Sequence, residues 1–161
     1  MAAIGDSPVP DPQTRLKALT DRLREQGYRL TPQRVAVLRI LAASKGHPSV
    51  EQIYDQIKVQ FPTTSLATVY KLVALLREMG EVLQLGFPNA SNRYDGNNPS
   101  PHPHLICTMC GEIRDLDLPA LSGMIQQASQ DLDYRGVSHR LDFYGICSRC
   151  QVGIPQTSPH G

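Results

Sequence analysis

The segments Cys107-Thr-Met-Cys110 and Cys147-Ser-Arg-Cys150 hold all four cysteines of the 161-residue chain. A C-x-x-C segment closes a tight loop that directs two thiolates at one point, and two such loops supply the four tetrahedral ligands of Zn²⁺. Four thiolates leave no position for water or substrate, so the spacing predicts a structural zinc site rather than a catalytic one. Two disulfides, or four unrelated buried thiols, are the alternative interpretation.

The sequence around the two cysteine pairs predicts a strand, a second strand, a helix and a third strand. Residues 104–107 and 112–118 flank the first pair as a hairpin, and residues 120–132 have helical spacing. A stretch that alternates apolar and polar residues leads into the second pair, as a half-buried strand would. Its inward residues would be Val137, His139, Leu141 and Phe143. The pattern predicts a small α/β domain stabilised by zinc and suited to dimerisation.

The first half of the chain has apolar residues at the spacing of amphipathic helices. The first helix is expected to end at Gly27, and Pro32 lies in the first turn of the second. Ser49 and Gln52 have the spacing of a capping box, which predicts the start of a third helix.

The fourth predicted helix covers residues 65–79 and carries Ser65, Thr68 and Lys71, three residues apart, on its polar face. A hairpin of two short strands is expected in residues 82–94. Helices followed by a small hairpin predict a winged helix-turn-helix, in which this fourth helix would enter the major groove of DNA. An ordinary helical subdomain with a polar outer face is the alternative.

The net charge of +1 excludes little, but its distribution is uneven. Residues 12–45 contain eight basic and two acidic residues, whereas residues 89–161 contain five basic and seven acidic residues. A basic first segment favours contact with a polyanion, and a solvated charged helix face is the alternative. The sequence has no long apolar run and no secretory apolar core, and its cysteines suit metal binding. These features predict a cytoplasmic protein with no membrane span.

A second set of possible metal ligands consists of histidines and aspartates. His102 and His104 lie two apart in a stretch kept extended by Pro101 and Pro103, so their side chains should leave the same side of the strand. Asp115 should lie across the predicted hairpin from them. Nitrogen and oxygen donors suit Fe²⁺, Mn²⁺ or Zn²⁺, and surface histidines beside a zinc site are the alternative.

Five motifs, in order, resemble those of the ferric-uptake-regulator superfamily of metal-dependent repressors. They are Leu30-Thr-Pro-Gln-Arg34, Gly46-His-Pro48, Ser65-Leu-Ala-Thr-Val-Tyr-Lys-Leu72, Arg93-Tyr-Asp95, and His102-Pro-His-Leu-Ile-Cys107 followed by Cys110. The resemblance covers residues 14–151. It implies an α+β protein with a winged-helix DNA-binding domain and hinge in residues 12–95, and a dimerisation and metal-sensing domain in residues 96–151. Residues 1–11 and 152–161 contain prolines among small polar residues and are expected to be disordered tails.

The resemblance also implies a regulatory Fe²⁺ or Mn²⁺ site that joins the two domains. In the peroxide-sensing branch the ligands are His, Asp, His, His and Asp, which fall on His47, Asp95, His102, His104 and Asp115. Iron-sensing members tend to carry glutamate at the two aspartate positions and often have His and Asp in place of Pro101 and Pro103. The chain therefore resembles the peroxide-responsive branch, and an iron- or zinc-uptake regulator is the alternative. His139 matches a ligand position of some relatives and is expected to be structural here.

The implied function is a repressor that binds an inverted-repeat operator as a homodimer. The residues expected to contact base edges and nearby phosphates are Ser65, Thr68, Tyr70 and Lys71, and those expected to contact the backbone are Arg15, Arg22, Arg29 and Arg34. A zinc enzyme is a rival, but the sequence has neither H-E-x-x-H nor H-x-E with P-C-x-x-C. A zinc-stabilised interaction module without DNA is a second rival.

Overall fold

The computed structural model of the chain describes residues 10–87, 90–131 and 134–152. The described residues divide into two compact units, residues 10–100 and residues 101–152. Apart from residues 10, 11 and 152, the two predicted tails lie outside the described residues. No helix among the described residues is both long and apolar enough to span a membrane.

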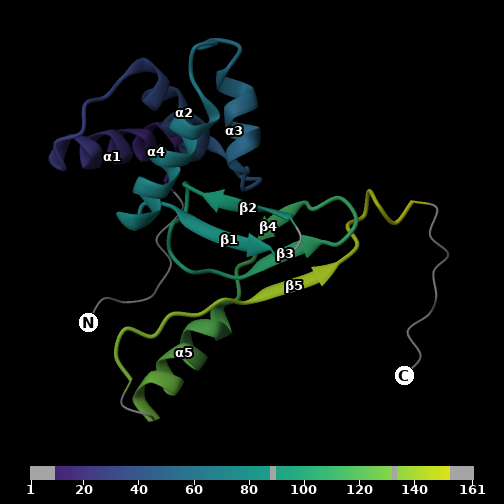
Figure 1. Cartoon of the computed structure of the whole chain (residues 1–161). Coiled ribbons are helices and arrows are strands. Elements are labelled where there is room, and N and C mark those ends of the chain that lie inside the picture. Colours follow the sequence, from purple (N-terminus) through teal and green to yellow (C-terminus); the bar gives the residue numbers. More distant parts are fainter. Residues whose placement is uncertain (1–9, 88–89, 132–133, 153–161) are drawn as a thin grey trace. The chain divides into compact units, whose positions relative to one another are not determined.

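The first unit begins with four helices, each opened by a polar capping side chain. They are α1 (Pro12–Glu25), α2 (Pro32–Ala43), α3 (Val50–Ile57) and α4 (Leu66–Glu78) (Figure 1). The capping residues, whose side chains accept from the first free backbone N–H groups, are Asp11, Thr31, Ser49 and Ser65. The predicted capping box between Ser49 and Gln52 is confirmed, because each side chain bonds the other residue's backbone N–H.

Apolar side chains from all four helices form one core. Fully buried members include Leu19 and Leu23 of α1, Leu38 of α2, Ile53 of α3 and Leu76 of α4. Burial of such a side chain contributes roughly 1.5–3 kcal/mol, so these contacts fix the position of the exposed face of α4.

A two-stranded hairpin follows the helices, as the sequence predicts. β1 (Leu83–Phe87) pairs antiparallel with β2 (Ala90–Asp95), with Leu83 opposite Asp95. Tyr94 is buried against the helical core, and its backbone N–H donates to the carbonyl of Pro48 at 3.0 Å. The prediction of a winged helix-turn-helix is confirmed, and the end of β2 is tied to the loop before α3.

The second unit has the predicted order of strand, strand, helix and strand. Its elements are β3 (His104–Cys107), β4 (Ile113–Asp115), α5 (Pro119–Asp131) and β5 (Asp142–Gly145) (Figure 1). The sheet order is β4-β3-β5, in which β3 is antiparallel to β4 and parallel to β5. His104 lies opposite Asp115 on one side and beside Asp142 on the other.

The predicted alternation of the last strand is wrong in its extent and its inward face. Strand pairing starts only at Asp142, because β3 is short and its first residue is the partner of Asp142. Phe143, expected inward, is 42% exposed, and Tyr144 is 60% exposed. The side chain of Asp142 is instead only 7% exposed. The buried side chain of this strand is therefore a carboxylate.

Candidate metal centres

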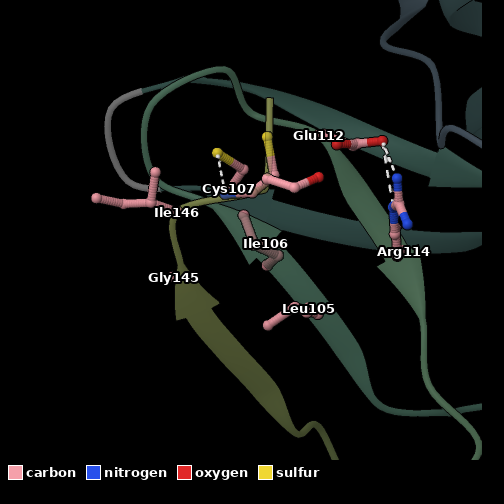
Figure 2. A pocket seen from close by; sticks show the side chains of 9 residues that line it. Leu105, Ile106, Cys107, Glu112, Arg114, Gly145 and Ile146 are labelled. Carbon is pink, nitrogen blue, oxygen red and sulfur yellow. Dashed lines mark hydrogen bonds and ion pairs between the residues drawn. The ribbon is translucent and has the colours of Figure 1, made fainter. Parts of the chain in front are cut away.

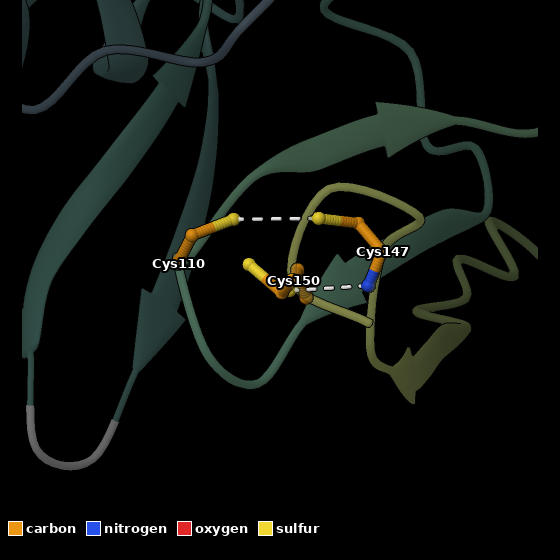
Figure 3. A group of neighbouring side chains, drawn as sticks. Cys110, Cys147 and Cys150 are labelled. Atoms are coloured by element: carbon orange, nitrogen blue, oxygen red, sulfur yellow. Dashed lines mark hydrogen bonds between the residues drawn. The ribbon is translucent and has the colours of Figure 1, made fainter. Parts of the chain in front are cut away.

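The four cysteines come together at one end of the three-stranded sheet (Figure 3). Cys107 ends β3, Cys110 lies in the turn toward β4, and the second pair follows β5. Their sulfur atoms all lie within 4.8 Å of one another. All four are free thiols, and the Sγ atoms of Cys110 and Cys147 are 3.7 Å apart, far beyond a disulfide bond length. The arrangement is a four-cysteine zinc site, and the disulfide alternative is not supported.

The thiols of this cluster perturb one another. The backbone N–H of Cys147 donates to Cys107 Sγ at 3.3 Å, which lowers the pKa of the Cys107 thiol to about 6. Contact with the Cys147 sulfur, and then with the Cys110 sulfur, raises the pKa of Cys150 to about 12. Four thiolates this close repel one another without a cation among them. A bound Zn²⁺ supplies that cation, so this donor set fits a structural zinc ion.

A pocket of about 230 Å³ lies beside the cysteine cluster (Figure 2). Its lining includes Leu105 and Ile146, which are 41% and 39% exposed, and the ion pair between Glu112 and Arg114 at 3.1 Å. Apolar side chains therefore reach the surface of this unit near the zinc site.

The second unit also brings together two histidines and one aspartate, as the sequence predicts. His102 Nε2 lies 3.2 Å from Asp115 Oδ1, and His104 Nε2 lies 3.9 Å from the same oxygen. The two imidazole rings have centroids 4.4 Å apart. The His104 side chain is 1% exposed, and the two rings and the carboxylate offer nitrogen and oxygen donors at one point. Donors of this kind suit Fe²⁺, Mn²⁺ or Zn²⁺.

The first unit contributes a histidine and an aspartate of its own. His47 Nε2 lies 3.3 Å from Asp95 Oδ2, and both side chains are almost fully buried. Asp95 Oδ1 accepts from the backbone N–H groups of Asn97 and Asn98 at 2.8 and 2.9 Å, which fixes the carboxylate. The sequence-predicted ligands thus form two local donor sets, one in each unit.

The backbone of His47 has an unusual conformation. Its φ of +51° makes it the one described residue other than glycine with a positive φ. This region costs a residue with a side chain roughly 1–2 kcal/mol. The guanidinium of Arg93 donates to the carbonyl of Gly46 at 2.8 Å and also to the carbonyl of His47. Arg93 therefore holds the strained loop that carries the ligand.

Sequence reasoning missed one polar residue beside these donors. Asp142 Oδ1 lies 3.3 Å from His104 Nδ1, and Arg140 Nε lies 2.7 Å from Asp142 Oδ2. The predicted alternation had turned Asp142 outward, and nothing in the sequence gives the register of the parallel strand. Among the described residues, His139 belongs to no cluster of three or more possible metal ligands.

The residues expected to read bases are exposed, and they lie on α4 or at its N-cap. Ser65 caps the helix and its hydroxyl lies 2.9 Å from that of Thr68, while Lys71 is exposed. Tyr70 is 43% exposed, and its hydroxyl donates to Glu51 of α3. This hydrogen bond lowers the pKa of Glu51 and raises the pKa of Tyr70. The phenol is therefore held in one orientation.

The arginines expected to contact phosphates differ in exposure. Arg22 and Arg29 are exposed, and Arg34 is partly exposed while it donates to the carbonyl of Arg29 at 2.6 Å. Arg15 is only 7% exposed, which the sequence did not predict. Its guanidinium donates to the residue after β2 and to a residue shortly before β1.

Arg15 makes three hydrogen bonds within the first unit. Its Nε donates to the carbonyl of Gly96 at 2.7 Å, and its terminal nitrogens donate to the carbonyl and carboxylate of Glu81 at 2.7 and 3.1 Å. A Cβ added at Gly96 would lie 2.6 Å from the Cβ of Leu41, so only glycine fits where this segment crosses α2. Arg15 thus ties α1 to the residues on both sides of the hairpin.

The first unit is a winged helix-turn-helix. The second is a small sheet with a four-cysteine zinc site and with histidine and aspartate donors. Together they define a metal-binding, DNA-binding transcription regulator. The chain belongs to the ferric uptake regulator family, whose sequence profile matches residues 25–144. It is a transcription regulator and not an enzyme, which removes the zinc-enzyme alternative.

Similar proteins of known function and similar solved structures belong to the same family. The chain is 38% identical over 129 residues to the peroxide-responsive repressor PerR of Staphylococcus aureus strain USA300, covering 80% of this chain and 86% of that protein. Its fold matches the Helicobacter pylori ferric uptake regulator Fur with a TM-score of 0.73 and 23% identity, over 91% and 97% of the two chains. It matches the Campylobacter jejuni peroxide stress regulator with a TM-score of 0.64 and 30% identity, over 84% and 98%.

Proposed function

We propose that this protein is a metal-dependent, peroxide-responsive repressor that binds inverted-repeat operator DNA as a homodimer. The observation that carries the proposal is the composition of the histidine and aspartate donors. Asp95 and Asp115 stand where iron-sensing relatives tend to have glutamate, and the similarity to a peroxide-responsive repressor covers 80% of the chain. An iron- or zinc-uptake regulator is the second candidate, because the choice between the branches depends on these two aspartates.

The regulatory ion would bind donors from both units. His47 and Asp95 belong to the proposed DNA-binding domain, residues 12–95, whereas the other three ligands belong to the proposed dimerisation and sensing domain, residues 96–151. An ion that needs both sets stabilises the arrangement in which they meet, and this differential affinity shifts the conformational equilibrium. The spacing of the two α4 helices in a dimer would then match two operator half-sites.

The dimer would form through the second unit. β5 is one of the two edge strands of the sheet, and exposed apolar side chains lie on β3, on β5 and just after β5. These residues are Leu105, Phe143, Tyr144 and Ile146. Exposed apolar side chains on one sheet would be stabilised by burial against a second copy of the same surface.

DNA contacts would divide between the two sets of exposed polar residues. Ser65, at the N-cap of α4, and Thr68, Tyr70 and Lys71, within α4, would contact base edges and nearby phosphates. Arg22, Arg29 and Arg34 would contact the phosphate backbone. Because Arg15 is buried, we assign it a structural role instead. If the metal-loaded protein shifts no DNA in a gel-mobility assay, it would be an interaction module, and this outcome would contradict the proposal.

Peroxide would act at the regulatory site. Fe²⁺ held by the five proposed ligands would promote the two-electron oxidation of a neighbouring imidazole by hydrogen peroxide. The residues expected to react are His47 or His102, either of which would gain one oxygen atom as water is released. The altered ring would bind metal less well, and the operator would be released.

Mass spectrometry tests this mechanism directly. Iron-loaded protein is treated with dilute peroxide, and manganese-loaded protein is the control. We expect one added oxygen on the peptide containing His47 or His102 in the iron form only, together with loss of operator binding. Loss of operator binding with both peptides unmodified would contradict peroxide sensing at this site.

The expected cytoplasmic location is part of the same proposal, since the zinc thiolates require a reducing compartment.

A further inference from the structure

The imidazole of His104 lies between two carboxylates within the second unit. Its Nε2 is 3.9 Å from Asp115 Oδ1, and its Nδ1 is 3.3 Å from Asp142 Oδ1. The ring itself is 1% exposed, so water has little access to either nitrogen. One carboxylate belongs to the proposed ligand set, and the other has no role in the function described above.

The sheet backbone sets this arrangement. His104 is the register partner of Asp115 in the antiparallel pair and of Asp142 in the parallel pair. Register partners on neighbouring strands project their side chains from the same face, so the three side chains form a row. The backbone N–H of His104 also donates to the carbonyl of Leu141 at 3.0 Å, which fixes the start of β5 beside β3.

The carboxylate of Asp142 is itself held in place. Arg140 Nε lies 2.7 Å from Oδ2, which leaves Oδ1 facing the imidazole. The other end of β5 is fixed as well, because the backbone N–H of Thr108 donates to the carbonyl of Gly145 at 2.8 Å, two residues before Cys147. The zinc site therefore anchors the strand that carries Asp142.

We propose that Asp142 is a positioning residue for the regulatory metal site. At a separation of 3.3 Å, Asp142 Oδ1 would accept an Nδ1–H of His104, which would select the tautomer whose Nε2 carries a lone pair. That lone pair faces the side of Asp115, where the metal would bind. Metal-binding histidines commonly donate their second ring N–H to a carboxylate, and loss of that partner weakens metal binding by about 10- to 100-fold. The inference rests on the proposed function in that it takes His104 as a ligand.

The tautomer of His104 tests this inference without DNA or regulatory metal. Full-length protein with its structural zinc is labelled with ¹⁵N-histidine, and two-bond ¹⁵N–¹H correlations identify which ring nitrogen carries the proton. We expect Nδ1–H in the parent. In Asp142→Asn, Arg140 retains the side-chain oxygen, so the amide NH₂ faces Nδ1 and the tautomer should invert to Nε2–H. Asp142→Ala should lose the preference for Nδ1–H.

Mn²⁺ affinity gives the second readout, by competition with a chelator. Both Asp142 variants should bind Mn²⁺ about 10- to 100-fold more weakly than the parent. Asp117→Asn is the matched control, since it removes the same charge from an exposed residue of the same unit, and its affinity should stay within about twofold of the parent. Retained zinc in each variant reports an intact second unit.

Three outcomes would overturn the inference. The first is a parent that carries Nε2–H, and the second is an Asp142→Asn variant that keeps both the parent tautomer and the parent Mn²⁺ affinity. The third is weakened Mn²⁺ binding with an unchanged tautomer, which would make Asp142 a direct ligand. If the parent binds neither Mn²⁺ nor Fe²⁺, the proposed function fails, whereas the tautomer result still decides the role of Asp142.

Discussion

Replacement of Arg15 by methionine distinguishes a structural arginine from a DNA-contacting one. Arg15→Met keeps most of the buried side-chain volume and removes the guanidinium, with its three hydrogen bonds to Gly96 and Glu81. Each such bond contributes a net free energy of about 1 kcal/mol, so the free energy of unfolding should fall by about 3 kcal/mol. The Glu81 side chain is 19% exposed, and its partial rehydration reduces the loss to about 2–3 kcal/mol.

Urea unfolding measures this change. With an m-value of about 1 kcal/mol/M for a unit of this size, the unfolding midpoint should fall by about 2–3 M. Arg29→Met is the matched control, because Arg29 is exposed, and its free energy of unfolding should change by less than about 0.5 kcal/mol.

For operator binding the two variants should exchange roles, so that Arg29→Met is affected and Arg15→Met is not. Each dimer of Arg29→Met would lose about two phosphate contacts, so the slope of log affinity against log salt should become less steep by about two. Arg15→Met should retain the parent slope. An Arg15→Met variant with parental stability and a slope reduced by two would refute the structural assignment.

Four further predictions concern the metal sites and α4. Cys110→Ser should lose zinc and unfold the second unit, as zinc analysis and circular dichroism would detect, and a folded zinc-free variant would contradict a structural role. Zinc affinity of the parent should fall as pH decreases, because protons compete for the thiolates, most readily for Cys150 with its raised pKa; a pH-independent affinity would be inconsistent with four thiolate ligands. Arg93→Ala should weaken Mn²⁺ binding roughly tenfold, because the strained loop at His47 loses both donors, and unchanged Mn²⁺ binding in a chelator competition would remove Arg93 from the account. Tyr70→Ala should remove the discrimination at one base pair, which is typically worth about 1–3 kcal/mol, in a scan of substituted operators. A uniform loss at all positions would exclude base reading.

Local features of the fold could be predicted from the sequence. The capping box at Ser49 depends on residues three apart, and the pairing of His104 with Asp115 follows from a short hairpin around the first cysteine pair. Metal ligands at fixed short spacing could be predicted for the same reason, because a tight loop determines which side chains meet.

Long-range placements could not be predicted. Arg15 bonds Gly96, 81 residues away in the sequence, so its charge pattern alone could not distinguish a buried hydrogen-bond donor from a phosphate contact. Asp142 faces His104 only because β5 pairs in parallel with β3 at one register, and a shift of one residue would turn it to the other face. The strain at His47 depends on tertiary contacts with Arg93.

The most direct test of the account is replacement of His47 by alanine. Mn²⁺ affinity and operator affinity are measured on the same zinc-loaded preparation, with His139→Ala as the control histidine. If one ion bridges the two donor sets, His47→Ala should bind Mn²⁺ at least about 100-fold more weakly and lose metal-dependent operator binding, while His139→Ala retains both. A His47→Ala protein that binds Mn²⁺ and its operator as tightly as the parent would contradict the account.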